Sequence, residues 1–203
     1  MSGGPVSGPV IVDSGGANIS SLRFALGRIG CNAPLTADPE LITGASHVFL
    51  PGVGAADDAM RRLEERGLAQ LVRGLRQPVL GICLGMQLLF EYSAEDGGRA
   101  CLGVVPGRVE KILAAPDRPV PHMGWNLTSL SPDSGLFAGL PRAAHFYFVH
   151  SYAAPVGLDT IAVADYGGEF TAAVAHGNFH GTQFHPERSG PAGARVLQNF
   201  LAL

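Results

Sequence analysis

The sequence is poor in lysine, and it contains no long run of apolar residues. Lys111 is the only lysine, no run of Lys and Arg stands out, and the formal net charge is −3. Nucleic-acid-binding proteins carry basic patches, so this charge balance argues against a nucleic-acid partner. No apolar run approaches the roughly 18 residues of a membrane span, and the first residues lack a charged-then-apolar leader. We therefore expect no membrane segment, no secretory signal and a cytoplasmic location.

Cysteines are also few. Cys31, Cys83 and Cys101 are an odd number, and none of them forms a C-x-x-C pair. Disulfide frameworks and zinc sites depend on such pairing, so neither is expected. We expect reduced thiols and no metal or cofactor, with Cys31 and Cys101 serving as small buried apolar side chains.

The rest of the composition is that of a folded domain. The chain has 203 residues, of which 46% are hydrophobic and 15% are charged. This length favours a single domain with a full core. Residues 1–9 are rich in Gly, Ser and Pro and are expected to form a flexible tail, which leaves residues 10–203 as the domain.

The first half of the chain alternates between short apolar strands and amphipathic helices. The strands are predicted at Val10–Val12, His47–Leu50 and Val79–Ile82. The helices that follow them are marked by apolar residues at helical spacing: Leu22, Ala25, Leu26 and Ile29; then Met60, Leu63, Leu68, Leu71, Val72 and Leu75 in one long helix; then Leu84–Phe90. This alternation predicts a parallel sheet with helices on both faces and sites at the carboxyl ends of the strands.

The second half changes to a strand-like period. After a polar loop at Ser93–Ala100, apolar or alternating segments are separated by Gly, Pro and Asn. These segments are 103–112, 124–130, 146–153, 160–164 and 170–175, followed by a closing helix at about 192–203. Antiparallel strands are predicted there. The fold class is therefore α/β, an open mixed sheet that is parallel in the N-terminal half and antiparallel in the C-terminal half.

The segment Pro78–Phe90 carries the strongest chemical signal. Cys83 lies at the corner between the strand and the helix, and Gly81 and Gly85 flank it. Small neighbours allow a sharp turn that exposes the central side chain, and the start of the helix supplies free amides and positive potential. This arrangement predicts a nucleophile elbow with a cysteine as the nucleophile.

A nucleophilic cysteine needs a base, and the seven histidines are the candidates. Only His185 is followed two residues later by a carboxylate, Glu187, which would point to the same side in an extended segment. Pro186 disfavours helix for His185 and so supports that geometry. We predict Cys83 as nucleophile, His185 as base and then acid, and Glu187 as the group that orients the imidazole.

Longer motifs identify a family. Four segments resemble class I glutamine amidotransferases: GICLGMQLLF around Cys83, LPGVG at Leu50–Gly54, FYFVHSY at Phe146–Tyr152 and GTQFHPERSG at Gly181–Gly190. Two more, PHMGWN at Pro121–Asn126 and DSGGANISS at Asp13–Ser21, resemble the glutaminase subunits of imidazole glycerol phosphate synthases. The resemblance extends from about Val10 to Leu203 and implies a flavodoxin-like class I amidotransferase domain.

The resemblance also implies a reaction and a set of site residues. The reaction is hydrolysis of L-glutamine to L-glutamate and ammonia through a thioester on Cys83. The backbone amides of Val53 and Leu84 would form the oxyanion hole. The other glutamine-binding residues that the resemblance implies are Gly52, Gly54, Gln87, His150, Ser151 and Tyr152. His150 could instead be a satisfied core histidine.

The same resemblance implies a protein partner. Ammonia would pass to a cyclase subunit, a (β/α)₈ barrel that forms a heterodimer with the glutaminase and makes imidazole glycerol phosphate and AICAR in histidine biosynthesis. Met123, Trp125 and Asn126 are assigned to the surface that faces this partner, because Met and Trp suit the centre of an interface. The alternative for Trp125 is that it caps its own core.

Three other functions share parts of this pattern. A cysteine hydrolase or peptidase would share the elbow, but would have no need of Gln87 or PHMGWN. A binding subunit with a vestigial Cys83 would have no need of His185 and Glu187. A different amidotransferase, with another acceptor for ammonia, would share every catalytic motif and remains open at this point.

Overall fold

The computed structural model describes residues 8–15 and 19–203, so most of the expected tail at residues 1–9 lies outside the described residues. The strands are β1 (Val10–Val12), β2 (Leu35–Thr36), β3 (Val48–Gly52), β4 (Val79–Cys83), β5 (Phe90–Ser93), β6 (Arg99–Ala100), β7 (Val105–Lys111), β8 (His122–Leu130), β9 (Ala143–His150), β10 (Tyr152–Ala153), β11 (Thr160–Asp165), β12 (Glu169–His176) and β13 (Phe179–Thr182). The helices are α1 (Ile19–Arg28), α2 (Pro39–Thr43), α3 (Ala56–Glu65), α4 (Leu68–Arg73), α5 (Leu84–Leu89) and α6 (Gly190–Phe200).

A mixed sheet runs through the middle of the described structure. Its strand order is β2-β1-β3-β4-β13-β12-β11-β8-β9. The pairs from β2 to β13 are parallel, and the pairs from β13 to β9 are antiparallel. The predicted α/β class, with its change from parallel to antiparallel pairing, is confirmed. The parallel part also includes β13, a strand from near the end of the chain. The spacing of apolar residues in the sequence did not predict this strand.

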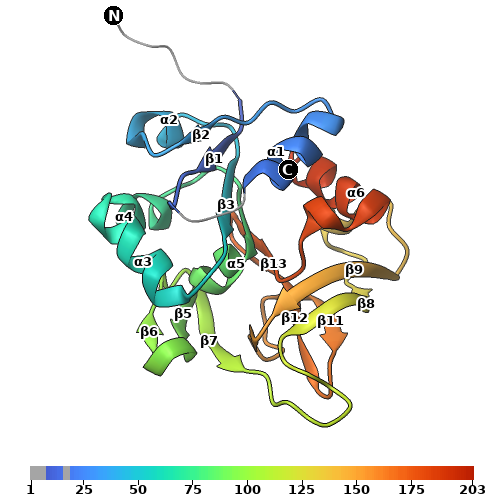
Figure 1. Ribbon diagram of the computed structural model, residues 1–203. Helices are drawn as coiled ribbons and strands as arrows, with labels where there is room; N and C mark the ends of the chain where they lie inside the picture. Colours follow the sequence, from blue (N-terminus) through green and yellow to red (C-terminus); the bar gives the residue numbers. More distant parts are fainter. Residues whose placement is uncertain (1–7, 16–18) are drawn as a thin grey trace, which may run out of the picture.

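Helices cover both faces of the parallel part (Figure 1). Helices α1 and α6 lie on one face, where Leu26, Phe49 and Phe200 belong to one buried apolar cluster. Helices α2 to α5 lie on the other face, where Leu63 and Val72 belong to a second cluster. Helices α1, α3 and α6 each bury one apolar stripe, whereas all six residues of α5 are buried. Helices layered on both faces are the arrangement expected of alternating strands and helices.

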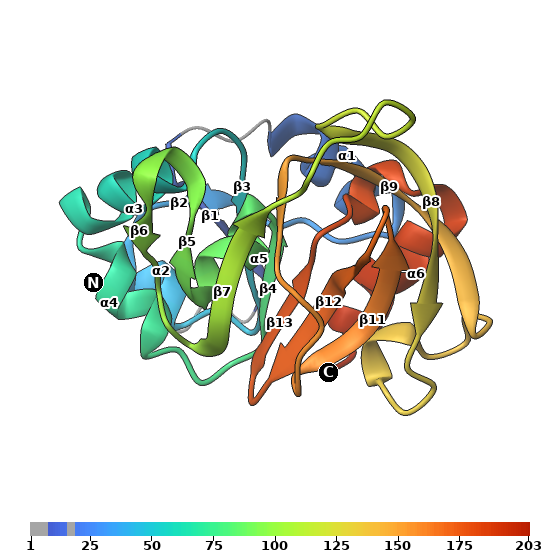
Figure 2. The same ribbon diagram turned by 90° about the horizontal axis from the view of Figure 1, so that it is seen from below.

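A smaller sheet packs beside α3 and α5, with the strand order β10-β7-β5-β6 (Figure 2). It corrects two predictions. The segment expected to be a polar loop, Ser93–Ala100, includes a 3₁₀ turn and strand β6. The single strand expected over 146–153 is divided at Ser151, because β9 belongs to the large sheet and β10 to the small one.

The helix boundaries also differ from the prediction. The long helix expected across Met60–Leu75 is two helices, α3 and α4, separated at Gly67, whose φ of 68° is left-handed and ends the helical path. The helix after Cys83 ends at Leu89, one residue earlier than expected, because Phe90 has an extended backbone and begins β5. Helical periodicity alone did not locate either break.

Three parallel strands end at the same edge of the large sheet. Gly52 at the end of β3 pairs with Cys83 at the end of β4, and Thr182 at the end of β13 pairs with Ile82. The loops that follow these strands are thereby brought together, as expected for the carboxyl edge of a parallel sheet. In the described part of the chain, no helix is long and apolar enough to cross a membrane.

Candidate active site

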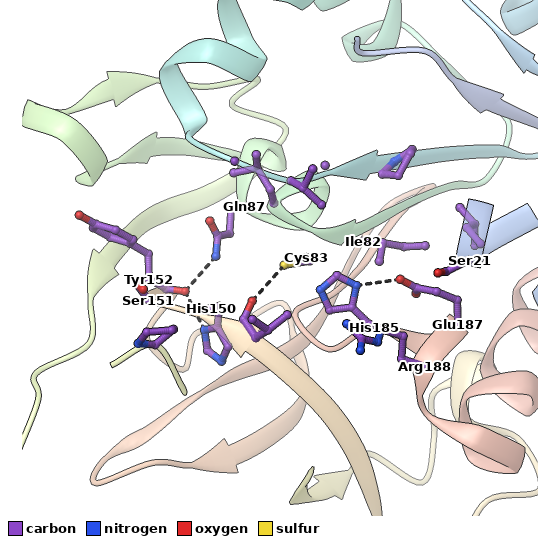
Figure 3. Close-up of a pocket in the computed structure, with 18 of the residues that line it drawn as sticks. Ser21, Ile82, Cys83, Gln87, His150, Ser151, Tyr152, His185, Glu187 and Arg188 are labelled. Carbon is purple, nitrogen blue, oxygen red and sulfur yellow. Dashed lines mark hydrogen bonds and ion pairs between the residues drawn. The ribbon is translucent and has the colours of Figure 1, made fainter. Parts of the chain in front are cut away.

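A cavity of about 390 Å³ opens at this carboxyl edge (Figure 3). The structure brings together there every residue predicted for catalysis, the oxyanion hole or glutamine binding. The predicted residues that line it are Gly52, Val53, Gly54, Cys83, Leu84, Gln87, His150, Ser151, Tyr152, His185 and Glu187. Since these residues come from segments far apart in sequence, their convergence in one cavity is a property of the fold.

Cys83 occupies a strained corner between β4 and α5. Its φ of 53° and ψ of −111° lie outside the ordinary regions for a residue with a side chain, which costs roughly 1–3 kcal/mol. Close glycine packing makes the corner possible, because a Cβ on Gly85 would overlap the Leu50 carbonyl oxygen. This is the geometry predicted for a nucleophile elbow.

His185 and Glu187 are joined by a buried hydrogen bond. The distance between Nδ1 of His185 and Oε1 of Glu187 is 2.8 Å, and their side chains are only 9% and 8% exposed. The predicted pairing is present, but the expected extended geometry is wrong. His185 has an extended backbone, whereas Pro186 opens a 3₁₀ turn through Arg188 that folds Glu187 back. Pro favours such a first turn because its φ is already fixed near the helical value.

The loop that carries His185 is fastened to β9 through a buried serine. The Ser189 hydroxyl donates to the His185 carbonyl at 2.7 Å and accepts from the Tyr147 N–H at 3.0 Å. The His185 N–H in turn donates to the Tyr147 carbonyl at 2.9 Å. These three bonds fix the backbone that presents the imidazole to the cavity.

Cys83 and His185 are close but not hydrogen-bonded in this conformation. The Cys83 thiol donates to the Val149 carbonyl, with Sγ 3.7 Å from the oxygen. Nε2 of His185 is buried and has no hydrogen-bond partner among residues 8–15 and 19–203. Burial alone would lower the pKa of His185, but the neighbouring Cys83 and Glu187 raise it to about 10. A histidine held beside a cysteine in this way can act as its base and, later, as the proton donor to a leaving group.

Gln87 connects the cavity wall to a residue that the sequence did not single out. Its side-chain amide donates to the Tyr152 carbonyl and to Oε1 of Gln183, both at 2.9 Å. The amide nitrogen of Gln183, which is completely buried, then lies 3.8 Å from Sγ of Cys83 and donates to it. Gln183 stands in the Gln-Phe-His-Pro-Glu string, and its position two residues before His185 was the available signal.

His150 lines the cavity, but protein groups occupy both of its ring nitrogens. Nδ1 donates to the Tyr152 carbonyl at 2.8 Å, and Nε2 lies 2.9 Å from Nδ1 of His122. The ring therefore has the bonding of a satisfied core histidine, the alternative considered above. The predicted contact with glutamine therefore falls to the backbone groups of His150, and it remains a prediction.

Glu95 is a second cavity residue without a sequence signal. It is half-buried, and one carboxylate oxygen accepts the Ala56 N–H at 2.7 Å. Burial raises the pKa of Glu95, the bond from Ala56 opposes that rise, and Asp96 adds to it. Among the described residues that line the cavity, Glu95 is the carboxylate not committed to a histidine.

The residues predicted for the partner surface lie outside the cavity, on β8 at the far end of the sheet (Figure 2). Met123 and Trp125 are 63% and 56% exposed, and Leu127, two residues on along the same face of the strand, is 51% exposed. The Trp125 and Tyr147 rings form a T-shaped pair at a centroid distance of 6.2 Å. Asn126 points to the other face and donates to the Asp165 carbonyl at 2.8 Å. More than half of the Trp125 side chain is therefore free to meet another surface.

The cavity thus combines a strained cysteine, a histidine oriented by a carboxylate and several amide donors, which suits acyl transfer through a thioester. Residues 10–203 match the family described as glutamine amidotransferase class-I. The chain belongs to this family. It is an amidotransferase of the class whose motifs were found around Cys83 and His185.

Individual relatives resemble this amidotransferase over nearly their whole length. It is 52% identical over 199 residues to the imidazole glycerol phosphate synthase subunit HisH 1 of Vibrio vulnificus (strain YJ016), covering 96% of this chain and 97% of the relative. It is 53% identical over 193 residues to subunit HisH of Xanthomonas axonopodis pv. citri (strain 306), covering 95% and 96%.

Solved structures show the same fold at low sequence identity. A crystal structure of a glutamine amidotransferase superposes with a TM-score of 0.74 at 20% identity, covering 96% of this chain and 97% of that one. The structure of PurLQS from Thermotoga maritima superposes with a TM-score of 0.69 at 19% identity, covering 97% and 98%. The amidotransferase fold is therefore shared by proteins whose sequences are much less similar than those of the two HisH subunits.

Proposed function

We propose that this amidotransferase is the glutaminase subunit of an imidazole glycerol phosphate synthase, and that it hydrolyses L-glutamine to L-glutamate and ammonia. The observation that carries this proposal is the match at about half identity, over nearly the whole of both chains, to relatives that bear that name. The cavity supports it, because Cys83, His185 and Glu187 line the same space. The three free thiols suit a reducing cytoplasm, where we place the reaction.

The proposed chemistry begins at Cys83. Its thiolate attacks the side-chain amide carbon of glutamine, and the carbonyl electrons move to the oxygen. When this tetrahedral intermediate collapses, the C–N bond breaks, and His185 gives its proton to the departing nitrogen. The remaining γ-glutamyl thioester is attacked by water that His185 deprotonates. The C–S bond then breaks, releasing glutamate and restoring the cysteine.

The intermediate needs donors for its negative oxygen. The Leu84 amide follows the nucleophile at the start of α5, which is the position that an elbow provides for one donor. Val53, between Gly52 and Gly54 in the loop after β3, is our second donor. Two backbone amides aimed at a developing oxyanion are the largest single contribution in many acyl transfers.

The charged ends of glutamine need complementary groups. We assign the α-ammonium group to Glu95, because Glu187 is already bonded to His185. Gln87 uses its amide hydrogens within the protein, so its Oε1 is available to accept from the substrate. Backbone groups at Ser151 and Tyr152 complete the wall opposite Cys83.

Ammonia released into water would be protonated and lost, so we propose a cyclase barrel as the partner in a heterodimer. The exposed face of β8 with Met123 and Trp125 is our docking surface for it. If glutamine hydrolysis is coupled to the use of ammonia by the barrel, hydrolysis should be slow in the isolated chain and faster when the partner is bound. The permissive glycines around Val53 are the proposed moving part of this control.

The decisive experiment measures glutamate released from glutamine by the purified chain, with and without the cyclase barrel of the same organism. Faster release of glutamate in the complex supports the proposal. Equal rates with and without the barrel would contradict the proposed control of hydrolysis by the partner. The Cys83→Ala variant in complex should not use glutamine but should still form imidazole glycerol phosphate from added ammonium. If the cyclase barrel does not bind this chain and does not use the ammonia that it releases, the chain serves another acceptor.

A further inference from the structure

An unbroken series of hydrogen bonds connects β8 to the catalytic cysteine. It begins at Asn126, whose amide nitrogen lies 3.4 Å from Nε2 of His122. Nδ1 of His122 lies 2.9 Å from Nε2 of His150, and His150 bonds the Tyr152 carbonyl. From that carbonyl the series continues through Gln87 and Gln183 to Sγ of Cys83.

The direction of these bonds follows from what each atom can do. The Tyr152 carbonyl can only accept, so Nδ1 of His150 carries its proton and Nε2 of His150 is an acceptor. The atom that faces Nε2 must then donate, which places a proton on Nδ1 of His122. Nε2 of His122 is left as an acceptor for the amide of Asn126. Each ring is thus set in one tautomer by its neighbour.

Both rings are buried among aromatic side chains. His122 is 3% exposed and His150 is 6% exposed. The His122 ring stacks on Tyr166 at a centroid distance of 4.0 Å and on Phe148 at 5.0 Å. Burial lowers the pKa of His122 to about 4 and that of His150 to about 3. The pair is therefore neutral at pH 7, as the series of donors and acceptors requires.

The Tyr152 carbonyl is where this histidine pair meets the cavity. It accepts both Nδ1–H of His150 and the side-chain amide of Gln87. Without His122, Nε2 of His150 would be a buried acceptor with no donor, and the ring would gain by turning away from Tyr152 to find one. The carbonyl would then lose one of its two donors, and the wall that holds Gln87 would loosen.

We propose that His122 is a positioning residue of the glutamine site: through its hydrogen bond it fixes the tautomer and orientation of His150, and so the Tyr152 and Gln87 groups that form one wall of the cavity. The inference rests on the proposed glutaminase function. His122 does not reach the substrate. It acts from β8, on the side of the sheet where Asn126 closes the series.

Two substitutions separate the hydrogen bond from the shape of the ring. His122→Phe keeps the aromatic stack with Tyr166 and Phe148 but has no donor. His122→Asn loses the stack but can place an amide N–H near the position of Nδ1. If the donor matters, the second variant should recover what the first loses.

The first readout is covalent labelling of Cys83 by two probes, 6-diazo-5-oxo-L-norleucine and iodoacetamide. The diazoketone needs the glutamine pocket, and iodoacetamide needs only an accessible thiol. We expect His122→Phe to slow the diazoketone about tenfold, the ratio typical of a buried acceptor that loses its donor. The iodoacetamide rate should change less than about twofold, and His122→Asn should recover most of the diazoketone rate.

Several outcomes would overturn the inference. These are a diazoketone rate for His122→Phe equal to that of the unmutated chain, an equal loss with both probes, or no recovery in His122→Asn. In the complex with the cyclase barrel, His122→Phe should raise the KM for glutamine more than it lowers kcat. If the unmutated complex releases no glutamate from glutamine, the proposed function itself is wrong, whatever the variants show.

A second measurement needs no variant and no activity. Nitrogen NMR of the chain labelled at its histidines distinguishes a protonated from an unprotonated ring nitrogen. The inference requires Nδ1–H and bare Nε2 in both His122 and His150 at pH 7. A proton on Nε2 of His150 would reverse the series and overturn it, even if His122→Phe fails to fold.

Discussion

The imidazole of His185 and the carboxylate of Glu187 share a buried hydrogen bond of 2.8 Å between Nδ1 and Oε1. Glu187→Gln keeps the size of the side chain and an oxygen acceptor but removes the charge. We expect the pKa of His185 to fall from about 10, because one of the two groups that raise it is neutralised. Glutamine hydrolysis should fall at least about a hundredfold, as is typical when an acid–base group loses its tuning.

The measurement combines histidine NMR titration with glutamate release in the complex. A matched control is Glu65→Gln, a carboxylate on α3 that is 60% exposed and forms an ion pair with Arg61 on the surface. It should leave both the pKa of His185 and the rate unchanged. An unaltered rate in Glu187→Gln would mean that Glu187 does not orient the base.

Close packing under the elbow gives a second prediction. A methyl group at Gly85 would overlap the Leu50 carbonyl oxygen of β3, and that backbone cannot move without disturbing the sheet. We expect Gly85→Ala to lower the free energy of unfolding by about 2 kcal/mol or more, in the range for overpacking. Gly27→Ala in α1 adds a methyl group in open space, and helix propensity should make it neutral or slightly stabilising. Urea unfolding of the two variants compares them directly.

The sequence predicted most of this site because its signals are local. Cys83 with its flanking glycines, and His185 with Glu187 two residues later, can be recognised within a few residues of chain. The carboxyl edge where they meet follows from the alternation of strands and helices. Even the wrong geometry expected around Pro186 did not affect the pairing, because a 3₁₀ turn also brings the two side chains together.

The remaining contacts depend on pairing across the sheet. His122 meets His150 because β8 and β9 pair in that register, and residues 28 positions apart give no local sign of it. Gln183 reaches Cys83 because β13 inserts beside β4, although β13 is four residues long and has no distinctive period. Side-chain contacts of this kind depend on which strands are neighbours. The sequence predicted a mixed parallel and antiparallel sheet, but it did not predict the order of its strands.

The exposed face of β8 leads to a third prediction. Trp125→Ala should weaken binding of the cyclase barrel about tenfold or more, because exposed aromatic residues at an interface centre carry much of the binding energy. Leu158→Ala removes an apolar side chain that is even more exposed than Trp125, from the loop before β11, and should leave binding unchanged. Calorimetry with the purified barrel measures both. Equal affinity of the Trp125→Ala variant and the unmutated chain would place the docking surface elsewhere.

The buried histidine pair predicts how stability depends on pH. Burial lowers the native pKa of His122 to about 4, below the ordinary histidine value of 6.5. As pH falls below 6.5, the unfolded chain binds a proton at this position while the folded chain stays neutral. Stability is therefore lost from about pH 6.5 down to about pH 4, and between pH 7 and pH 5 the loss from His122 is at most about 2 kcal/mol.

His122→Phe removes this titration but keeps an aromatic ring of similar size. We expect the difference in unfolding free energy between pH 7 and pH 5 to be smaller in this variant, by up to about 2 kcal/mol, because acid no longer favours its unfolded state at residue 122. Urea unfolding at both pH values measures the two differences, and groups common to both chains cancel. His145→Phe, on the exposed side of β9, controls for the loss of a histidine that is not buried. If His122→Phe and the unmutated chain lose the same stability, His122 must accept a proton while folded, and it could not then act as the neutral link between Asn126 and His150.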